Sequence, residues 1–433
     1  MATATTPSPS GAPTVSVKDA AAHARRSNLR WALGLTVAVV VLFLLYWKIL
    51  PAVGGETATF FRKWLSVSAA SEMVLWVIFA LGLNIVVGYA GLLDLGYVAF
   101  WAIGGYVAGW IMSPFASEMM NDKSWAGLKV NFLGHPPAIE GLDRGIHLNF
   151  WLVLPIAGLV CAFFGILIGA PTLRLKSDYL ALVTLGFGEI IPQIFRNGER
   201  LGAGGNFNLS NGDKGITPID TIPTWPFSYI PGVPDQLGLR AEDLPFKFLV
   251  YCLLAAAIVF LSLRIREGRL GRAWLAIRED ELAASMMGVP LMRTKLAAYA
   301  VGAFAGGIGG VAFATFVNGI YASRFDFAIS IILLAMVVLG GMGNVWGVTV
   351  GALALAWINS TGLEQFGNTF NEALGTNVNF KNYQFLLFGL ILVLMMLFRR
   401  EGLIPETRTK QVLAEPERGE LEAVGADMEG GQA

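Results

Sequence analysis

The sequence predicts an all-α fold: a polytopic integral membrane helix bundle with about ten spans. Composition is the first observation, because 55% of the 433 residues are hydrophobic, only 14% are charged and the mean hydropathy is +0.59. These values describe a chain far more apolar than a soluble globular protein. The second observation is that the apolar residues gather in runs long enough to cross a bilayer core as helices, which rise about 1.5 Å per residue.

The charges of the chain balance, so composition alone points to no charged partner. Lys plus Arg and Asp plus Glu number 31 each, which gives no overall field for nucleic acid. Cys161 and Cys252 fall inside apolar runs and predict small buried side chains rather than a disulfide or a metal site. The three histidines lie in tails or loops without ligand spacing, and the predicted spans contain none. A membrane-embedded enzyme that needs converging bases or metal ligands is therefore not expected.

Both ends of the chain predict disordered cytoplasmic tails, residues 1–30 and 401–433, around a transmembrane domain at 31–400. The first tail is rich in Ala, Thr, Ser and Pro and gathers basic residues just before the first apolar run. That run, 31–50, is long enough for a span, and its length favours a retained helix over a cleaved signal peptide.

Two later apolar runs are too long for one crossing and are interrupted by glycines. Residues 71–113 are broken by Gly88, Gly91, Asp94 and Gly96, and residues 327–358 by Gly340, Gly341, Gly343 and Asn344. Each run predicts two spans joined by a turn. Irregular backbone at membrane depth is tolerated only against protein or a water-lined cavity, so we expect the first turn to lie beside a central pathway. Asp94 either caps the following helix or faces that pathway.

The other apolar runs each predict one span. These spans are 150–173, 179–196, 246–263, 296–318 and 383–398. Glu189 lies inside a span, where an ionisable side chain either faces a hydrated pathway or is a structural carboxylate that is partnered or protonated. Glycines spaced for close helix packing predict two small-residue faces, one at Gly302, Gly306 and Gly310, the other at Gly343, Gly347 and Gly351. The long connections 114–149 and 197–246 are predicted to lie outside.

Residues 264–295 form a charged island between two apolar runs. They carry seven of the thirty-one Lys and Arg residues, so the positive-inside rule places them in the cytoplasm, and ten spans place both termini on the same side. Asp280 and Glu281 are acidic residues of the kind that begin helices, and Gly288 followed by Pro290 is typical of a helix end. These residues predict a helix of about two turns between Asp280 and Gly288. Small side chains on this helix leave room for another protein, and Leu282, Met286 and Met287 offer apolar contact area.

The island resembles the docking loop of a known family. The pattern E-x-A-A from Glu281, followed by Gly288, resembles the EAA loop of ABC-importer permeases, and AIREDELAASMMGV resembles the branched-chain amino acid permease family of the LivM type. Further stretches that resemble this family are 82–106, 174–191, 336–344 and 397–405. Together the resemblance covers roughly residues 65–405, except for the loops near 114–149 and 200–246.

The resemblance implies the permease subunit of an ATP-driven importer, not an enzyme. The implied ATPase-coupling residues are Asp280, Glu281, Ala283, Ala284 and Gly288, and the candidates for the translocation pathway are Asn84, Asp94 and Glu189. The implied partners are two ABC ATPase subunits, a second related permease, an extracytoplasmic solute-binding protein and membrane lipid, with no nucleic acid. The implied location is the bacterial inner membrane, and the implied cargo is a branched-chain amino acid, with urea or a short amide as the alternative.

No cofactor is expected in this chain, because ATP would be bound by the partner. The glycine-rich run that ends at Lys214 lacks both the G-K-[ST] ending and the preceding strand of a phosphate loop. A secondary transporter is the alternative class. It would couple to ions through several intramembrane charges, whereas Asp94 and Glu189 are the only clear candidates in the predicted spans.

Overall fold

The computed structural model divides into two compact units, residues 1–52 and 53–433. The described residues are 32–42, 63–121, 123–134, 143–175, 177–202, 205–223, 244–375, 378–399 and 402–404. In the first unit, the helix Ala32–Leu42 lies within the first predicted span. The rest of that run, the first predicted tail and nearly all of the second lie outside the described residues, so the tails stay predictions.

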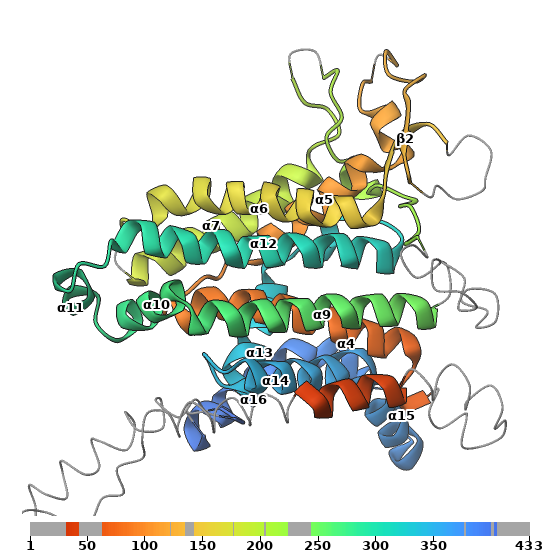
Figure 1. Ribbon diagram of the computed structural model, residues 1–433. Helices are drawn as coiled ribbons and strands as arrows, with labels where there is room; N and C mark the ends of the chain where they lie inside the picture. The colour runs from red at the N-terminus through yellow and green to blue at the C-terminus, as the bar shows by residue number, and fades with distance from the viewer. Residues whose placement is uncertain are drawn as a thin grey trace, which may run out of the picture. The chain divides into compact units, whose positions relative to one another are not determined.

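The described part of the second unit consists mainly of helices (Figure 1). The α-helices are α4 (Val67–Asn84), α5 (Val98–Ile111), α6 (Phe150–Thr172), α7 (Ser177–Arg196), α9 (Leu244–Glu267), α10 (Arg269–Glu279), α11 (Glu281–Met286), α12 (Leu291–Val317), α13 (Phe327–Gly340), α14 (Val345–Trp357), α15 (Leu363–Leu374) and α16 (Gln384–Phe398). Two π-helical segments, η2 (Ile85–Tyr89) and η7 (Ile358–Gly362), continue α4 and α14. The predicted helical membrane fold is confirmed. Among the described residues six helices are long and apolar enough to cross a membrane, so the count of about ten stays a prediction.

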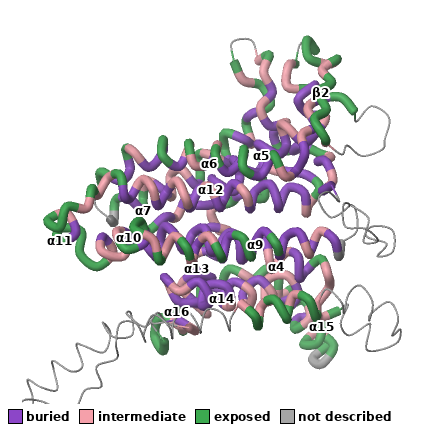
Figure 2. Tube along the Cα trace, in the orientation of Figure 1, coloured by how far each residue is buried: buried purple, intermediate pink, exposed green. Residues whose placement is uncertain are grey.

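Helices α4 and α12 form the centre of the second unit. α12 packs against α4, α5 and α6, while α4 also packs against α9 and α14, and Figure 2 shows these central helices largely buried. The predicted glycine face of α12 is confirmed, because a Cβ at Gly302 would lie 2.4 Å from a Val86 methyl and one at Gly310 2.4 Å from the Trp101 carbonyl oxygen. Glycine therefore lets α12 approach its neighbours closely.

Both over-long apolar runs are broken as predicted. Residues 90–97 separate η2 from α5, and 341–344 separate α13 from α14. Gly91 and Gly343 have φ values of 68° and 87°, which favour glycine because it has no Cβ. The second predicted glycine face is partly wrong: Gly347 lies against the Gly340 carbonyl, but Gly343 belongs to the turn and not to α14.

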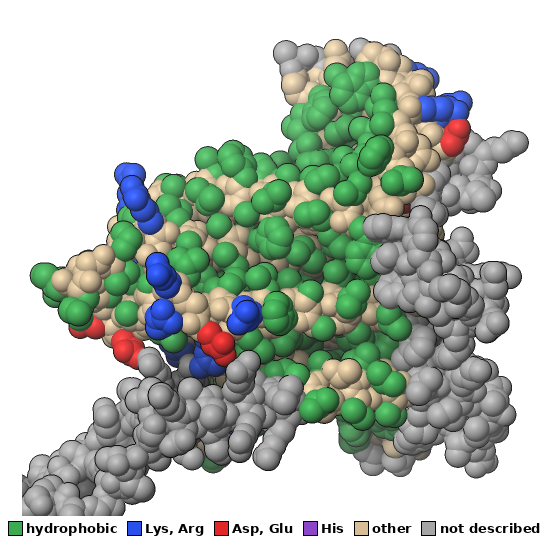
Figure 3. All heavy atoms as spheres, viewed as in Figure 1, with side chains coloured by type: hydrophobic (Ala, Val, Ile, Leu, Met, Phe, Trp, Pro, Cys, Tyr) green, Lys and Arg blue, Asp and Glu red, His purple; other side chains and the backbone are tan. Residues whose placement is uncertain are grey.

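Apolar surface remains exposed along the helices. Figure 3 shows hydrophobic side chains covering the face in view, with charged side chains near α10 and α11 and beside the strands. In the span that contains α16, only 6% of the residues in its apolar stretch are buried, against 83% in the span that contains α4. So large an apolar surface requires lipid or another membrane chain to cover it.

Two features differ from the sequence prediction. α9 and α12 extend into the charged island, and α10 fills part of it. The helical period of α10 is carried by Gly271, Trp274 and Ile277, which are buried three residues apart among charged neighbours. The second difference is a three-stranded sheet in the predicted loop 114–149 and the residues just before it, ordered β1-β3-β2. Its strands are β1 (Met112–Ser113), β2 (Lys129–Phe132) and β3 (Gly145–Leu148).

A buried ion pair fastens this sheet to a later segment. The Nδ1 atom of His147 in β3 lies 2.8 Å from Asp220 Oδ1, and its Nε2 lies 2.9 Å from the Arg144 carbonyl oxygen. Both ring nitrogens face acceptors, so only the doubly protonated ring donates to both. Burial acts to lower the pKa of His147, but Asp220 and the Arg144 carbonyl outweigh it and raise this pKa above the ordinary 6.5.

This pair predicts that the sheet region loses stability as the pH rises. Because the folded-state pKa of His147 is raised, the stabilising charge is fully present below pH 6.5 and is lost as the pH rises through the folded-state pKa. Amide hydrogen exchange in β3, corrected for its intrinsic pH dependence, should become faster as the pH rises above 6.5. His147→Gln is the control and should show no such pH dependence. Equal acceleration in that variant would contradict the assignment.

Candidate functional site

The short helix predicted in the charged island is confirmed as α11. Its N-cap is Asp280, whose Oδ1 accepts hydrogen bonds from the backbone nitrogens of Leu282 and Ala283 at 2.8 and 3.0 Å. Its C-terminal end closes at Gly288, with φ 84°, and the Val289 nitrogen donates to the Ala284 carbonyl at 3.1 Å. This is a Schellman closure, so both ends of a helix too short to be stable alone are satisfied.

α11 exposes an apolar face. The face consists of Leu282, Met286 and Met287, which are 68%, 79% and 85% exposed. Ala283 is also exposed, while Ala284 is buried. Exposed methionines form adaptable apolar contacts, so this face suits the surface of another protein.

Glu281 makes an ion pair inside the chain. Its carboxylate binds the Nζ atom of Lys295 in α12, whose side chain is only 8% exposed against 53% for Glu281. This carboxylate therefore ties α11 to α12, and about half of the Glu281 side chain stays exposed beside the apolar face of α11.

α10 carries two contacts that the apolar pattern of the sequence did not reveal. The indole Nε1 of Trp274, which is fully buried, donates to the Thr294 carbonyl at 2.8 Å. One turn later, Arg278 Nη1 donates to the Gly88 carbonyl in η2. The apolar Trp274 and Ile277, three residues apart among charged neighbours, could have indicated a buried helix face. No local signal identifies the partner of Arg278, which is 190 residues away in the chain.

Asn84, the first predicted pathway residue, links the two broken runs. It is fully buried at the end of α4, and its Oδ1 accepts a hydrogen bond from the Gly343 nitrogen at 2.9 Å. It also lies against Gly88, where a Cβ would come 2.0 Å from the same oxygen. Asn84 thus joins the end of α4 and η2 to the break after α13.

Asp94, the second predicted pathway residue, is buried in the segment before α5. Its Oδ1 accepts from the Gly96 nitrogen at 2.9 Å, and the N-cap of α5 is Tyr97, so the interpretation of Asp94 as the helix cap is wrong. Its Oδ2 has no hydrogen-bond partner in the described chain, nor has the hydroxyl of Tyr299. Both residues line one small cavity together with Thr184 of α7.

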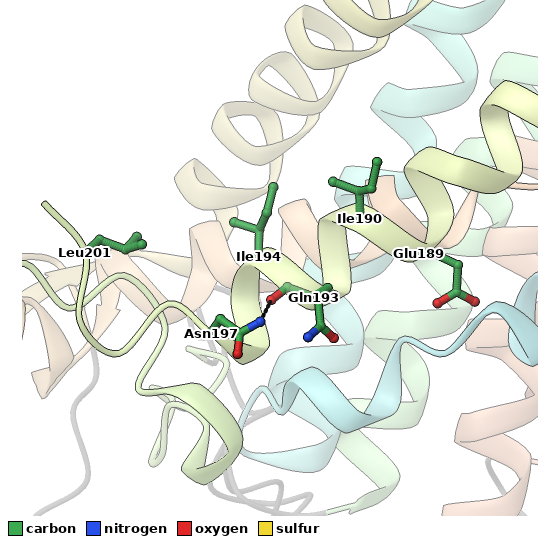
Figure 4. Close-up of a pocket in the computed structure, with 6 residues that line it drawn as sticks. All are labelled: Glu189, Ile190, Gln193, Ile194, Asn197 and Leu201. Carbon is green, nitrogen blue, oxygen red and sulfur yellow. Dashed lines mark hydrogen bonds between the residues drawn. The ribbon is translucent and has the colours of Figure 1, made fainter.

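Glu189, the third predicted pathway residue, lies on an exposed face of α7 (Figure 4). It lines an open pocket of about 560 Å³ together with Ile190, Gln193, Ile194, Asn197 and Leu201. Another face of α7 packs on the segment that holds Asp94, where Thr184 Oγ1 accepts from the Leu95 nitrogen at 3.1 Å. Asp94 and Glu189 therefore line different cavities, and the three predicted pathway residues do not share one site.

The ion pair of α11 predicts an asymmetric response to mutation. Glu281→Gln leaves a buried ammonium without its counter-charge, so we expect a loss of about 1–3 kcal/mol in the free energy of unfolding, reduced because Glu281 is half exposed. Lys295→Met leaves a carboxylate that water can solvate and should cost less. Thermal unfolding of the single variants and of the double variant measures the coupling. Strictly additive effects would show that the pair contributes nothing.

Comparisons with known proteins agree on one family. Residues 66–396 match the family model described as the permease component of branched-chain amino acid transport systems. The chain is 34% identical to the high-affinity branched-chain amino acid transport system permease protein LivM of Salmonella typhimurium, over 79% of this chain and 71% of that protein. It is 26% identical to a probable LivM permease of Methanocaldococcus jannaschii, over 79% of this chain and 95% of that protein. No solved structure matches the chain significantly.

Proposed function

This chain belongs to the family of branched-chain amino acid transport system permease components, and from that premise we propose that it is the membrane-spanning permease subunit of an ATP-driven importer. It is a multi-pass membrane protein and a transport subunit rather than a catalyst. The observation that carries the proposal is the exposed apolar face of α11, beside the cluster of basic residues that the positive-inside rule assigns to the cytoplasm.

The apolar face of α11 is the docking surface for the ATPase. The caps at Asp280 and Gly288 and the ion pair of Glu281 hold the helix in shape without a partner, which leaves Leu282, Met286 and Met287 for contact. ATP is bound and hydrolysed by the partner. The assembly contains two ATPase subunits, this chain, a second related permease and an extracytoplasmic binding protein, in a bacterial inner membrane with both termini of this chain in the cytoplasm.

The cargo is a branched-chain amino acid. The relatives named above are permeases of branched-chain amino acid systems, which supports this cargo over urea or a short amide. Delivery by the binding protein takes place at the other end of the bundle from α11, where the sheet lies (Figure 1).

The exposed face of α7 lines the translocation pathway, and the second permease covers it. A carboxylate and an amide at Glu189 and Gln193 are exposed in this chain within a predicted span. Lipid does not solvate a carboxylate, so water or another protein must receive this face. The pocket along α7 is the part of the pathway that this chain supplies.

Disruption of the apolar face of α11 tests the docking proposal. Met287→Asp should release the ATPase during purification and abolish ATP-dependent uptake of labelled leucine into proteoliposomes, because a charge replaces buried apolar contact. Val130→Asp, at an exposed position of β2, is the control and should leave ATPase binding unchanged.

Retention of the ATPase by Met287→Asp would contradict docking at α11. Leucine uptake that needs no ATP would instead identify a secondary transporter. Labelling of Ser285→Cys from outside intact cells would place α11 outside the cytoplasm and contradict the proposed docking. Competition by urea but not by isoleucine or valine would overturn the assigned cargo.

Neutralisation of the carboxylate tests the pathway proposal. Glu189→Gln should lower leucine uptake by about tenfold, the equivalent of about 1.4 kcal/mol, while the ATPase stays bound. Leu182→Ala, on an exposed part of the same helix, is the control. Unchanged uptake in Glu189→Gln would remove Glu189 from the pathway.

A further inference from the structure

Arg278 joins the segment that carries α11 to the broken end of α4. Its guanidinium donates to the Gly88 carbonyl in η2, and its stem covers Gly91, where a Cβ would lie 2.9 Å from Arg278 Cγ. Arg278 stands two positions before Asp280, the N-cap of α11. Arg278 of α10 therefore connects the chain just before α11 to the segment that leads to Asp94.

The peptide of Gly88 lies between Arg278 of α10 and the side chain of Asn84. It lies in a π-helical turn, a rare geometry that often occurs at functional sites. On one side it is held by Arg278, and on the other it lies against Asn84, whose Oδ1 accepts from Gly343 at 2.9 Å. Gly88 also lies against the second break, because a Cβ here would come 2.7 Å from the Gly343 nitrogen, and η2 leads directly into the first break at residues 90–97.

α10 is built to transmit a displacement of α11. The two helices are separated only by Asp280, whose nitrogen donates to the Ala276 carbonyl at 3.1 Å and whose carbonyl accepts from the Ala284 nitrogen at 3.0 Å. One turn before Arg278, buried Trp274 fastens α10 to Thr294 in α12. A displacement of α11 would therefore be passed to α10. α10 is anchored to α12 by Trp274 and contacts η2 through Arg278.

We propose, resting on the proposed function, that Arg278 is a positioning residue that couples ATPase movement to the translocation pathway through the Gly88 carbonyl. Arginine suits this role because its planar guanidinium holds a hydrogen bond at the end of a long side chain and stays charged. Lysine preserves the charge and one donor, whereas glutamine is too short to reach the same carbonyl from α10.

The test uses the complete importer in proteoliposomes with its binding protein, measuring labelled leucine uptake and phosphate release in one sample. Arg278→Gln should lower the leucine transported per ATP by about tenfold, within the usual range of coupling effects, while the ATPase subunits stay bound and hydrolysis continues. Arg278→Lys should restore part of the ratio. Arg272→Gln is the matched control, because Arg272 is exposed on the same helix and donates to the Glu267 carbonyl at 2.8 Å.

Three results would overturn the role of Arg278. The first is an amount of leucine transported per ATP in Arg278→Gln within about twofold of wild type. The second is loss of the ATPase subunits from that variant. The third is an equal fall in the leucine transported per ATP in Arg272→Gln. The wild-type importer separates this failure from that of the proposed function. If wild type shows no ATP-dependent uptake, the proposed function fails and the role of Arg278 with it.

Discussion

Hydrogen bonds from neighbouring elements allow the two broken helices to exist within an apolar bundle. A break in a helix at membrane depth leaves backbone groups that lipid cannot satisfy, so they must bond to protein or to water in a cavity. Here the nitrogens of Leu95, Gly96 and Gly343 donate to side chains of Thr184, Asp94 and Asn84. The Leu403 nitrogen donates to the Leu339 carbonyl at the second break. The irregular segments are thus held by specific polar contacts to side chains of α4, α7 and the first break itself.

The same constraint explains where glycine is needed. α12 supplies small positions along its length, so that the backbones of α4 and α5 approach it closely and surround the first break with protein. Bulk at Gly310 would meet the backbone of Trp101 and not a movable side chain. Close packing thus holds the centre of the bundle together, while α7 and α16 keep exposed faces for water, lipid or another chain.

The end of the bundle that carries α11 combines stability with exposure. Local capping shapes the helix, and Glu281 binds a buried lysine, so the apolar face is presented without support from a partner. Polar contacts of Arg278 and a buried anchor at Trp274 then connect this face to the centre of the bundle. The exposed helix α11 is thus connected to a closely packed bundle through the polar contacts of α10, in addition to the ion pair of Glu281.

Sequence patterns alone determined the membrane class, most span positions, the glycine breaks and the caps of α11, because each depends on residues that are neighbours in the chain. Hydropathy and cap residues act locally, and so they are visible in one sequence. The partners of Glu281, Asn84 and Arg278, the separate cavities of Asp94 and Glu189, and the sheet were decided only by tertiary structure. Those features depend on which side chain reaches a given carbonyl or charge from a distant segment, and the spacing of residues in one chain does not specify that distance.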